Sequence, residues 1–151
     1  MTTPTYKRHP AKLDALKLTK ILETYTIKKV CNDKYFSKKK YRRFLSMELI
    51  NLTKDCYTCL VKAYHCPDED KAMNYKQDAL LCISAFMAQL DVANNLYDTP
   101  IPNIEYWAEQ AVDVKESIEA WMINTKKQHL LTAYTRLSGY QEKEVTGKIV
   151  S

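Results

Sequence analysis

The chain has 151 residues and a net charge of +5, with 46% hydrophobic residues and only two glycines, Gly139 and Gly147. A domain of this length buries roughly two thirds of its unfolded surface, so we expect one hydrophobic core. Because the first 138 residues contain no glycine, the glycine-rich loops of Rossmann and P-loop nucleotide-binding proteins are excluded.

The sequence gives no sign of export or membrane insertion. No stretch approaches the roughly 18 to 20 uninterrupted apolar residues of a membrane span, and the N-terminal MTTPTYKRHPAKLD lacks the apolar segment of a secretory signal. The five cysteines are an odd number and most fall within helical patterns, which does not favour a disulfide framework. These features predict a cytoplasmic protein with no membrane partner.

Positive charge is concentrated at the beginning of the chain. Residues 1–43 carry 13 basic and 3 acidic groups, residues 44–125 carry 5 and 13, and residues 126–151 carry 5 and 2. The modest net charge therefore combines a basic N-terminal part with an acidic middle part.

Apolar residues recur every three or four positions in four segments, which predicts four helices. The first, over about 11–31, has its stripe at Ala11, Ala15, Leu18, Leu22 and Tyr25, widened by Ile21. The second, over about 38–65, has its stripe at Leu45, Leu49, Leu52, Cys56, Cys59 and Ala63.

The last two helices repeat the same spacing. The third, over about 69–97, has its stripe at Ala79, Ile83, Phe86, Leu90, Ala93 and Tyr97. The fourth, over about 104–137, has its stripe at Trp107, Ala111, Val114, Ile118 and Trp121, with Met122 beside it.

Short connections separate the predicted helices. Each offers a side-chain oxygen to cap the next helix, at Ser37, Asp68 and Asn103. Because short links favour antiparallel neighbours, we expect an all-α, antiparallel up-down four-helix bundle over 11–137. Residues 1–10 are predicted as an N-terminal arm and 138–151 as a flexible tail.

The segment KKVCNDKYFSKKKYRR, residues 28–43, carries eight basic residues and one acid, with aromatic residues between them. Positive charge combined with aromatic rings suits phosphates and unpaired bases. The predicted nucleic-acid-binding residues are Lys28, Lys29, Lys34, Tyr35, Lys38, Lys39, Lys40, Tyr41, Arg42 and Arg43. The alternative is a solvated loop whose lysines serve solubility.

Three of these lysines, Lys38, Lys39 and Lys40, fall in the predicted first turn of the second helix. Cations are unfavourable there, because the helix dipole places partial positive charge at this end. A bound phosphate would relieve the conflict, since exposed N–H groups at a helix start also attract anions.

Metal and catalytic alternatives have weaker support. Cys56 and Cys59 fall on the apolar stripe of one continuous helix, whereas zinc pairs usually lie on a turn. A run of acidic residues from Glu105 to Glu119 lacks the histidines that di-iron bundles require, so a solvated or subunit-facing strip is expected. No catalytic residue, metal or cofactor is predicted.

Four stretches together resemble a known family: LTKILETYTIKKV, YFSKKKYRR, ALLCISAFMAQLDVANNLY and IEAWMINTKK. Over about residues 13–128 the chain resembles the four-helix bundle family of the accessory variability determinant of diversity-generating retroelements. That family also includes the proteins encoded in intervening sequences of bacterial 23S rRNA genes. Ser37 stands where the family often has a proline.

The resemblance implies a homopentameric ring with a basic surface that binds RNA and DNA. In the retroelement branch it also implies association with a reverse transcriptase during mutagenic cDNA synthesis. A non-enzymatic accessory protein of this branch is the preferred interpretation. The alternatives are an intervening-sequence protein without a polymerase partner, a helical protein-protein scaffold and, last, a metal-dependent enzyme.

Overall fold

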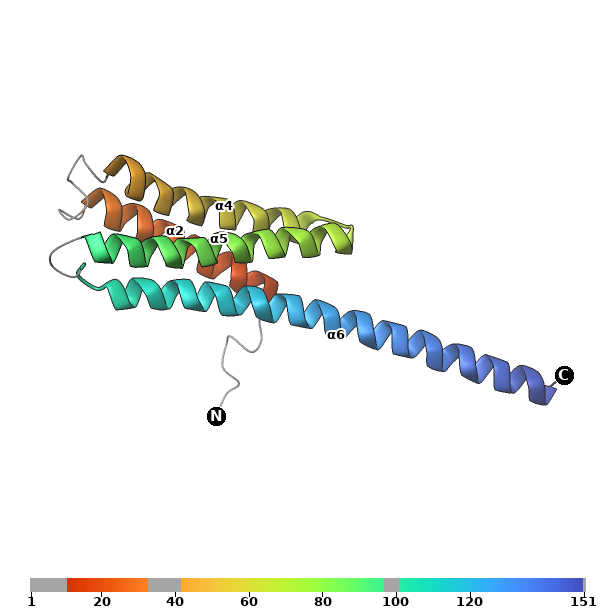
Figure 1. The fold of residues 1–151 in the computed structure, drawn as a ribbon. Helices are drawn as coiled ribbons and strands as arrows, with labels where there is room; N and C mark the ends of the chain where they lie inside the picture. The colour runs from red at the N-terminus through yellow and green to blue at the C-terminus, as the bar shows by residue number, and fades with distance from the viewer. Residues whose placement is uncertain (1–10, 33–41, 97–100, 151) are drawn as a thin grey trace. The chain divides into compact units, whose positions relative to one another are not determined.

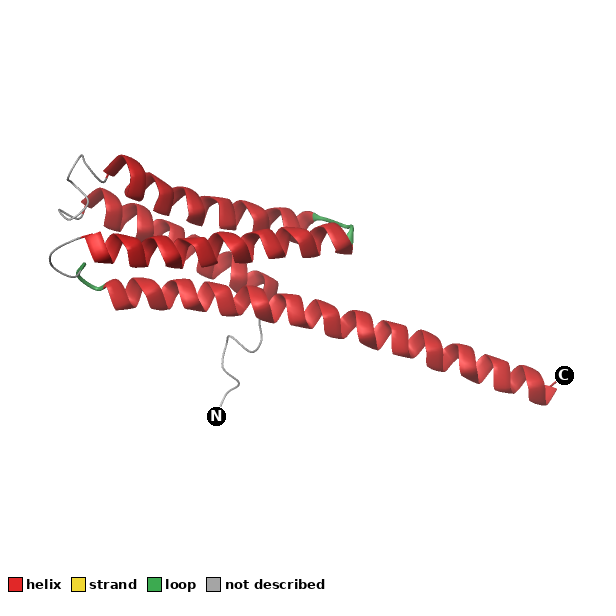
Figure 2. Cartoon of the chain, in the orientation of Figure 1, coloured by secondary structure: helices red, strands yellow, loops and turns green. Residues whose placement is uncertain are grey.

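The fold is described by a computed structural model for residues 11–32, 42–96 and 101–150. Within these ranges all residues lie in helices or short connections, without a strand, which confirms the predicted all-α class (Figures 1 and 2). The long helices are α2 (Ala11–Asn32), α4 (Met47–His65), α5 (Glu69–Leu96) and α6 (Ile104–Val150). A π-helical turn, η2 (Arg42–Ser46), leads directly into α4.

The chain divides into two compact units, Met1–Trp121 and Met122–Ser151. The first unit has the character of a helical bundle, in which α4 packs against both α2 and α5 (Figure 1). Its fourth helical segment is the part of α6 up to Trp121. The second unit consists of the remainder of α6.

The buried side of α2 differs from its predicted stripe. Ala15 and Leu22 are buried as expected, whereas Ile21, which was predicted to widen the stripe, is 46% exposed. Two threonines, Thr19 and Thr26, are fully buried instead. Burial of a hydroxyl is tolerated when it is hydrogen-bonded, and Thr19 Oγ1 donates to the Ala15 carbonyl at 2.6 Å.

The stripes of the other helices match the prediction more closely. On α4 and the preceding turn, Leu45, Leu49, Cys56 and Ala63 are buried, while Leu52 and Cys59 are partly exposed. The buried predicted residues of α5 are Ala79, Ile83, Phe86, Leu90 and Ala93. On α6 all five predicted residues are buried, at Trp107, Ala111, Val114, Ile118 and Trp121. Tyr97 lies outside the described residues.

Helix starts follow the predicted capping chemistry where they are described. Asp68 Oδ1 accepts hydrogen bonds from the backbone N–H groups of Asp70 and Lys71 at 3.0 and 3.2 Å, so Asp68 caps α5 as predicted. Asn103 precedes α6 with a φ of 57°, and its carbonyl accepts from Trp107 N–H at 3.1 Å. Ser37 lies outside the described residues.

Trp107 is the largest fully buried side chain of the described core. Its side chain is fully buried, and its indole Nε1 donates to Thr26 Oγ1 at 3.0 Å. Phe86 of α5 and Tyr25 of α2 meet its ring edge-on, with centroid distances of 6.1 and 6.0 Å. One side chain therefore ties α6 to both α2 and α5 by packing and by a satisfied polar group.

Helix α6 extends beyond its predicted end. The sequence analysis placed the end near residue 137, before Gly139, whereas the helix reaches Val150. A glycine inside a helix costs only about 1 kcal/mol relative to alanine, and the glutamine, glutamate and lysine residues after it favour helix. The described backbone of residues 138–150 is therefore helical.

One described helix, α5, is long and apolar enough to cross a membrane by length and composition. The helix is interrupted by polar and charged residues, so it is not the uninterrupted apolar stretch that was considered in the sequence. In this structure its apolar residues at 79, 83, 86 and 90 are buried in the bundle. Core helices of globular proteins share this composition.

Candidate nucleic-acid interface

The predicted binding residues fall at one end of the bundle where they are described. Lys28 and Lys29 lie in the last turns of α2, and the backbone of Arg42 and Arg43 opens η2. These two elements end and begin at the same end of the first unit (Figure 1). Six predicted residues lie outside the described ranges: Lys34, Tyr35, Lys38, Lys39, Lys40 and Tyr41.

The two lysines of α2 differ in their surroundings. Lys28 is exposed, as a phosphate contact requires. Lys29 is half-buried, and its Nζ donates to the Pro102 carbonyl at 2.7 Å. Lys29 therefore links α2 to the segment before α6, and only part of its donor capacity remains for a ligand.

The turn η2 is the irregular element of this end. Its π-helical hydrogen bonding accommodates more residues per turn than an α-helix, and such turns occur frequently at functional sites. Two consecutive residues, Leu45 and Ser46, are both buried here, at 6% and 2% exposure. The side chain before them, Phe44, points outward instead.

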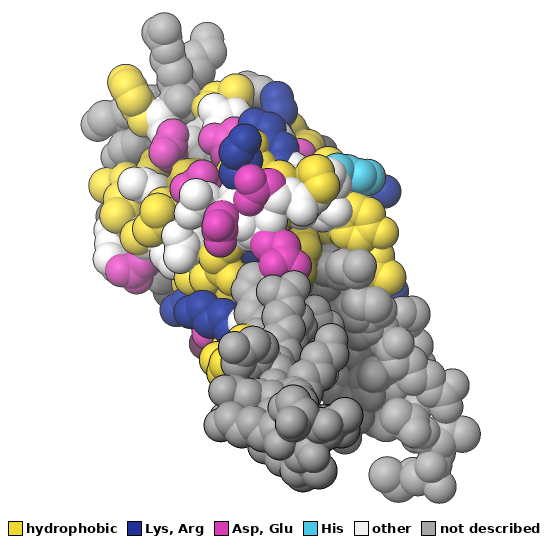
Figure 3. Space-filling model, turned by 90° about the vertical axis from the view of Figure 1, so that its right-hand side faces the viewer, with side chains coloured by type: hydrophobic (Ala, Val, Ile, Leu, Met, Phe, Trp, Pro, Cys, Tyr) yellow, Lys and Arg dark blue, Asp and Glu magenta, His cyan; other side chains and the backbone are white. Residues whose placement is uncertain are grey.

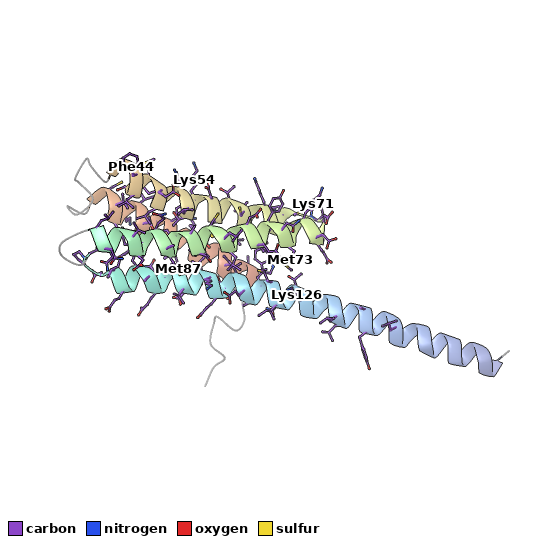
Figure 4. All side chains as sticks on the ribbon, viewed as in Figure 1. Phe44, Lys54, Lys71, Met73, Met87 and Lys126 are labelled. Atoms are coloured by element: carbon purple, nitrogen blue, oxygen red, sulfur yellow. The ribbon has the colours of Figure 1, made fainter. Side chains whose placement is uncertain are left out.

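Phe44 is a candidate binding residue that the sequence analysis missed. Its side chain is 76% exposed and projects away from the bundle (Figure 4). It follows Arg42 and Arg43 directly in the sequence. The sequence YRRF shows an aromatic residue directly after two arginines. Helical spacing alone did not indicate whether this ring is buried or exposed.

Ser46 introduces an unsatisfied polar atom at the same place. Its Oγ is buried and has no hydrogen-bond partner among the described residues, and it forms no side-chain cap for α4. A buried hydroxyl without a partner is costly, and such groups are uncommon in folded proteins. The start of α4 therefore sacrifices stability that an ordinary N-cap would provide.

A buried lysine lies elsewhere in the bundle. Lys76 of α5 is only 3% exposed, and its Nζ lies 4.4 Å from the centroid of the Trp121 ring. Burial lowers the pKa of this ammonium below its ordinary value, because the charged form loses hydration. Its spacing could have indicated burial, because Lys76 lies three residues before Ala79 and four after Ala72 on the buried side of α5. A charged residue is not normally expected at such a position.

Three cysteines of the bundle, Cys56, Cys59 and Cys82, lie where the thiolate form is disfavoured. Burial raises the pKa of the Cys56 thiol far above its ordinary value, and burial raises the pKa of Cys82 to about 11. Cys59 shifts in the same direction, again mainly because of burial. Thiolates are the nucleophilic and metal-binding form, and these surroundings disfavour it. Within the described ranges, no three His, Cys, Asp or Glu side chains are placed to hold a metal ion.

The acidic residues of α6 face outward. Glu105, Glu109, Asp113 and Glu116 are all exposed. The described bundle interior on this helix is instead formed by tryptophan, alanine, valine and isoleucine side chains. Carboxylates arranged in this way do not line an internal metal site of the di-iron type.

Comparison with known proteins found no matching family model, no matching curated protein and no matching solved structure.

Proposed function

We propose that the protein is a non-enzymatic accessory protein that binds RNA and DNA through the end of the bundle that carries Lys28, Arg42, Arg43 and Phe44. The observation that carries the proposal is the 76% exposed ring of Phe44 in a π-helical turn, directly after two arginines. Stacking on an aromatic ring favours unpaired bases, and the cations attract phosphates. Lys34, Lys38, Lys39 and Lys40 would add charge to the same segment.

The preferred partner is a reverse transcriptase of a diversity-generating retroelement, in which the protein would support mutagenic cDNA synthesis in the cytoplasm. Support for this partner comes from the four sequence stretches that resemble the accessory variability determinant family. A partner retained on the purified protein after nuclease treatment is expected for this branch. Loss of all partners after nuclease would favour the intervening-sequence branch.

We further propose that the bundle is up-down and antiparallel and assembles into a homopentameric ring. The side-chain pairs between neighbouring helices support the first part. Tyr25 of α2 meets Trp107 of α6, while Lys29, further along α2, meets Pro102, which precedes α6. Between α5 and α6, Lys76 meets Trp121 and Phe86 meets Trp107. In both cases, rising numbers on one helix meet falling numbers on the other, as antiparallel neighbours require.

Nucleic-acid affinity measured across a salt series tests the binding site. The variant Arg42→Gln/Arg43→Gln removes two proposed phosphate contacts. The slope of log affinity against log salt concentration should therefore become less steep by roughly 1.5. A matched control removes the same charge from exposed lysines elsewhere, as Lys54→Gln/Lys71→Gln (Figure 4). Its slope should stay close to that of the wild type.

Phe44→Ala should weaken binding to single-stranded RNA by about 1–3 kcal/mol, the usual loss for one stacked base, with little change in the salt slope. If all these variants bind as the wild type does, or if the wild type does not bind RNA or DNA, the proposal is wrong.

A further inference from the structure

The outward side of α2 is basic and partly apolar. Its exposed residues recur at spacings of three and four, which places them on one side of the helix. They are Leu13, Lys17, Lys20, Ile21, Thr24 and Ile27, and we refer to them as the α2 face; Lys28 and Cys31 follow at the end of the helix that carries the proposed nucleic-acid residues. The α2 face contains no acidic residue. Ile21 and Ile27 are 46% and 40% exposed, so apolar surface lies between the lysines.

The outward side of α6 within the first unit has the opposite charge. Its exposed residues are Glu105, Tyr106, Glu109, Val112, Asp113, Glu116 and Ala120, which we refer to as the α6 face. The α6 face contains no basic residue. Tyr106 and Val112 are 56% and 41% exposed, so apolar surface again accompanies the charges.

None of the lysines of the α2 face and none of the carboxylates of the α6 face forms an ion pair with another described residue. On the side of the molecule drawn in Figure 3, by contrast, acidic and basic side chains are interspersed. Two faces of single and opposite sign indicate complementary contacts outside the chain.

The α6 face carries a hollow suited to a lysine. It lies at the start of α6 and is lined by Ile101, Asn103, Ile104, Glu105, Tyr106 and Glu109. The isoleucines suit the aliphatic stem of a lysine, and the two carboxylates suit its ammonium group. The Tyr106 ring adds a surface over which a cation is stabilised.

We propose that the α2 face of one copy of the protein binds the α6 face of a second copy. The inference builds on the homo-oligomer proposed above and names the surfaces that form it. Because the two faces differ, the contact is head-to-tail, and each copy can bind one neighbour on each side. Repetition of such a contact forms a ring when the rotation closes.

A second copy explains both faces at once. A nucleic acid would be attracted by the lysines of the α2 face but repelled by the carboxylates of the α6 face. A basic protein partner would bind the α6 face and leave the α2 face uncovered. A second copy presents the complement of each.

Charge reversal tests this contact. Lys17→Glu/Lys20→Glu reverses the α2 face and leaves the proposed nucleic-acid residue Lys28 in place. Glu109→Lys/Asp113→Lys reverses the α6 face. Each variant should weaken self-association at least about tenfold, because like charges would then face each other. The chain that carries all four substitutions keeps the net charge of the wild type and restores opposite charges, so it should assemble again.

Sedimentation equilibrium without nucleic acid measures the assembly, with circular dichroism as the control for folding. Loss in the two single-face variants and recovery in the combined variant would support the contact. A monomeric wild type, single-face variants that still assemble, or a folded combined variant that stays monomeric would each overturn it. If Lys17→Glu/Lys20→Glu lowers RNA affinity without changing the mass of the assembly, the α2 face binds nucleic acid instead.

A wild type that does not bind RNA, with assembly that follows the expected pattern in the variants, would contradict only the nucleic-acid proposal.

Discussion

The surroundings of Trp107 and the turn η2 use aromatic side chains in opposite ways. Trp107 is fully buried, and its only polar group is hydrogen-bonded to Thr26. In η2 the ring of Phe44 is 76% exposed, and the buried Ser46 Oγ has no partner. The aromatic and polar groups around Trp107 are buried and hydrogen-bonded, which stabilises the fold. In η2 an apolar ring is left exposed and a buried hydroxyl has no partner among the described residues. Such groups are typical of ligand-binding sites.

The largest effect expected from this comparison follows truncation of the core aromatic. Trp107→Ala should lower the free energy of unfolding by about 3–5 kcal/mol, because it leaves a cavity between α2, α5 and α6 and removes the donor to Thr26. Urea denaturation followed by circular dichroism measures this loss. Phe44→Ala serves as the matched control and should change stability by less than about 0.5 kcal/mol, since its ring is exposed. Similar losses in both variants would contradict the distinction between the two regions.

A smaller contrast is expected between two buried hydroxyls. Thr26→Val removes the acceptor of the Trp107 indole N–H and should cost about 1–3 kcal/mol, because the buried donor is left unpaired. Ser46→Ala removes an oxygen without a partner and should leave stability unchanged or raise it by about 1 kcal/mol.

The same urea titrations compare the two substitutions. A destabilised Ser46→Ala protein would mean that this hydroxyl is satisfied in solution, and the contrast between the two regions would then be lost.

The smallest expected effect concerns Lys76 and pH. Because burial lowers the pKa of Lys76, the folded protein releases this proton at a lower pH than the unfolded chain, whose lysines titrate near 10.5. The free energy of unfolding should therefore rise as the pH increases from the folded pKa toward 10.5. Relative to Lys76→Met, the wild type should gain stability over this alkaline range.

Urea titrations at several alkaline pH values compare these two proteins. The thiols act in the opposite direction, since a raised pKa, about 11 for Cys82, makes stability fall as the pH rises above 9.0. Their contribution is common to both proteins and cancels in the difference. Parallel stability curves would contradict the effect assigned to Lys76.

Much of the core was predictable from spacing alone. The five predicted positions on α6 are all buried, because large apolar residues recur there at intervals of three and four without a competing polar residue. The cap at Asp68 was predictable because an aspartate stood directly before the apolar pattern. Both signals depend on neighbours in the sequence.

Other features depend on neighbours in space. The buried hydroxyl of Thr26 accepts a hydrogen bond from Trp107, which lies far away in the sequence. The buried Lys76 places its ammonium group over the ring of Trp121, which is also far away in the sequence. The π-helical turn changes the number of residues per turn, so the outward direction of Phe44 did not follow from an α-helical spacing. The charge of residues 28–43 indicated a binding segment, and the exposure of Phe44 adds the aromatic group at its end.

RNA binding at the end of the bundle that carries Phe44 is tested most directly by locating bound RNA on the protein. Ultraviolet crosslinking of a single-stranded RNA containing 4-thiouridine, followed by mass spectrometry of the crosslinked peptides, identifies the side chains in contact with bases. We expect crosslinks at Phe44 and in the basic segment from Lys28 to Arg43, and we expect fewer crosslinks at high salt, because salt weakens the phosphate contacts. Crosslinks confined to the exposed side of α5 or to α6, or an absence of crosslinks at saturating RNA, would contradict it.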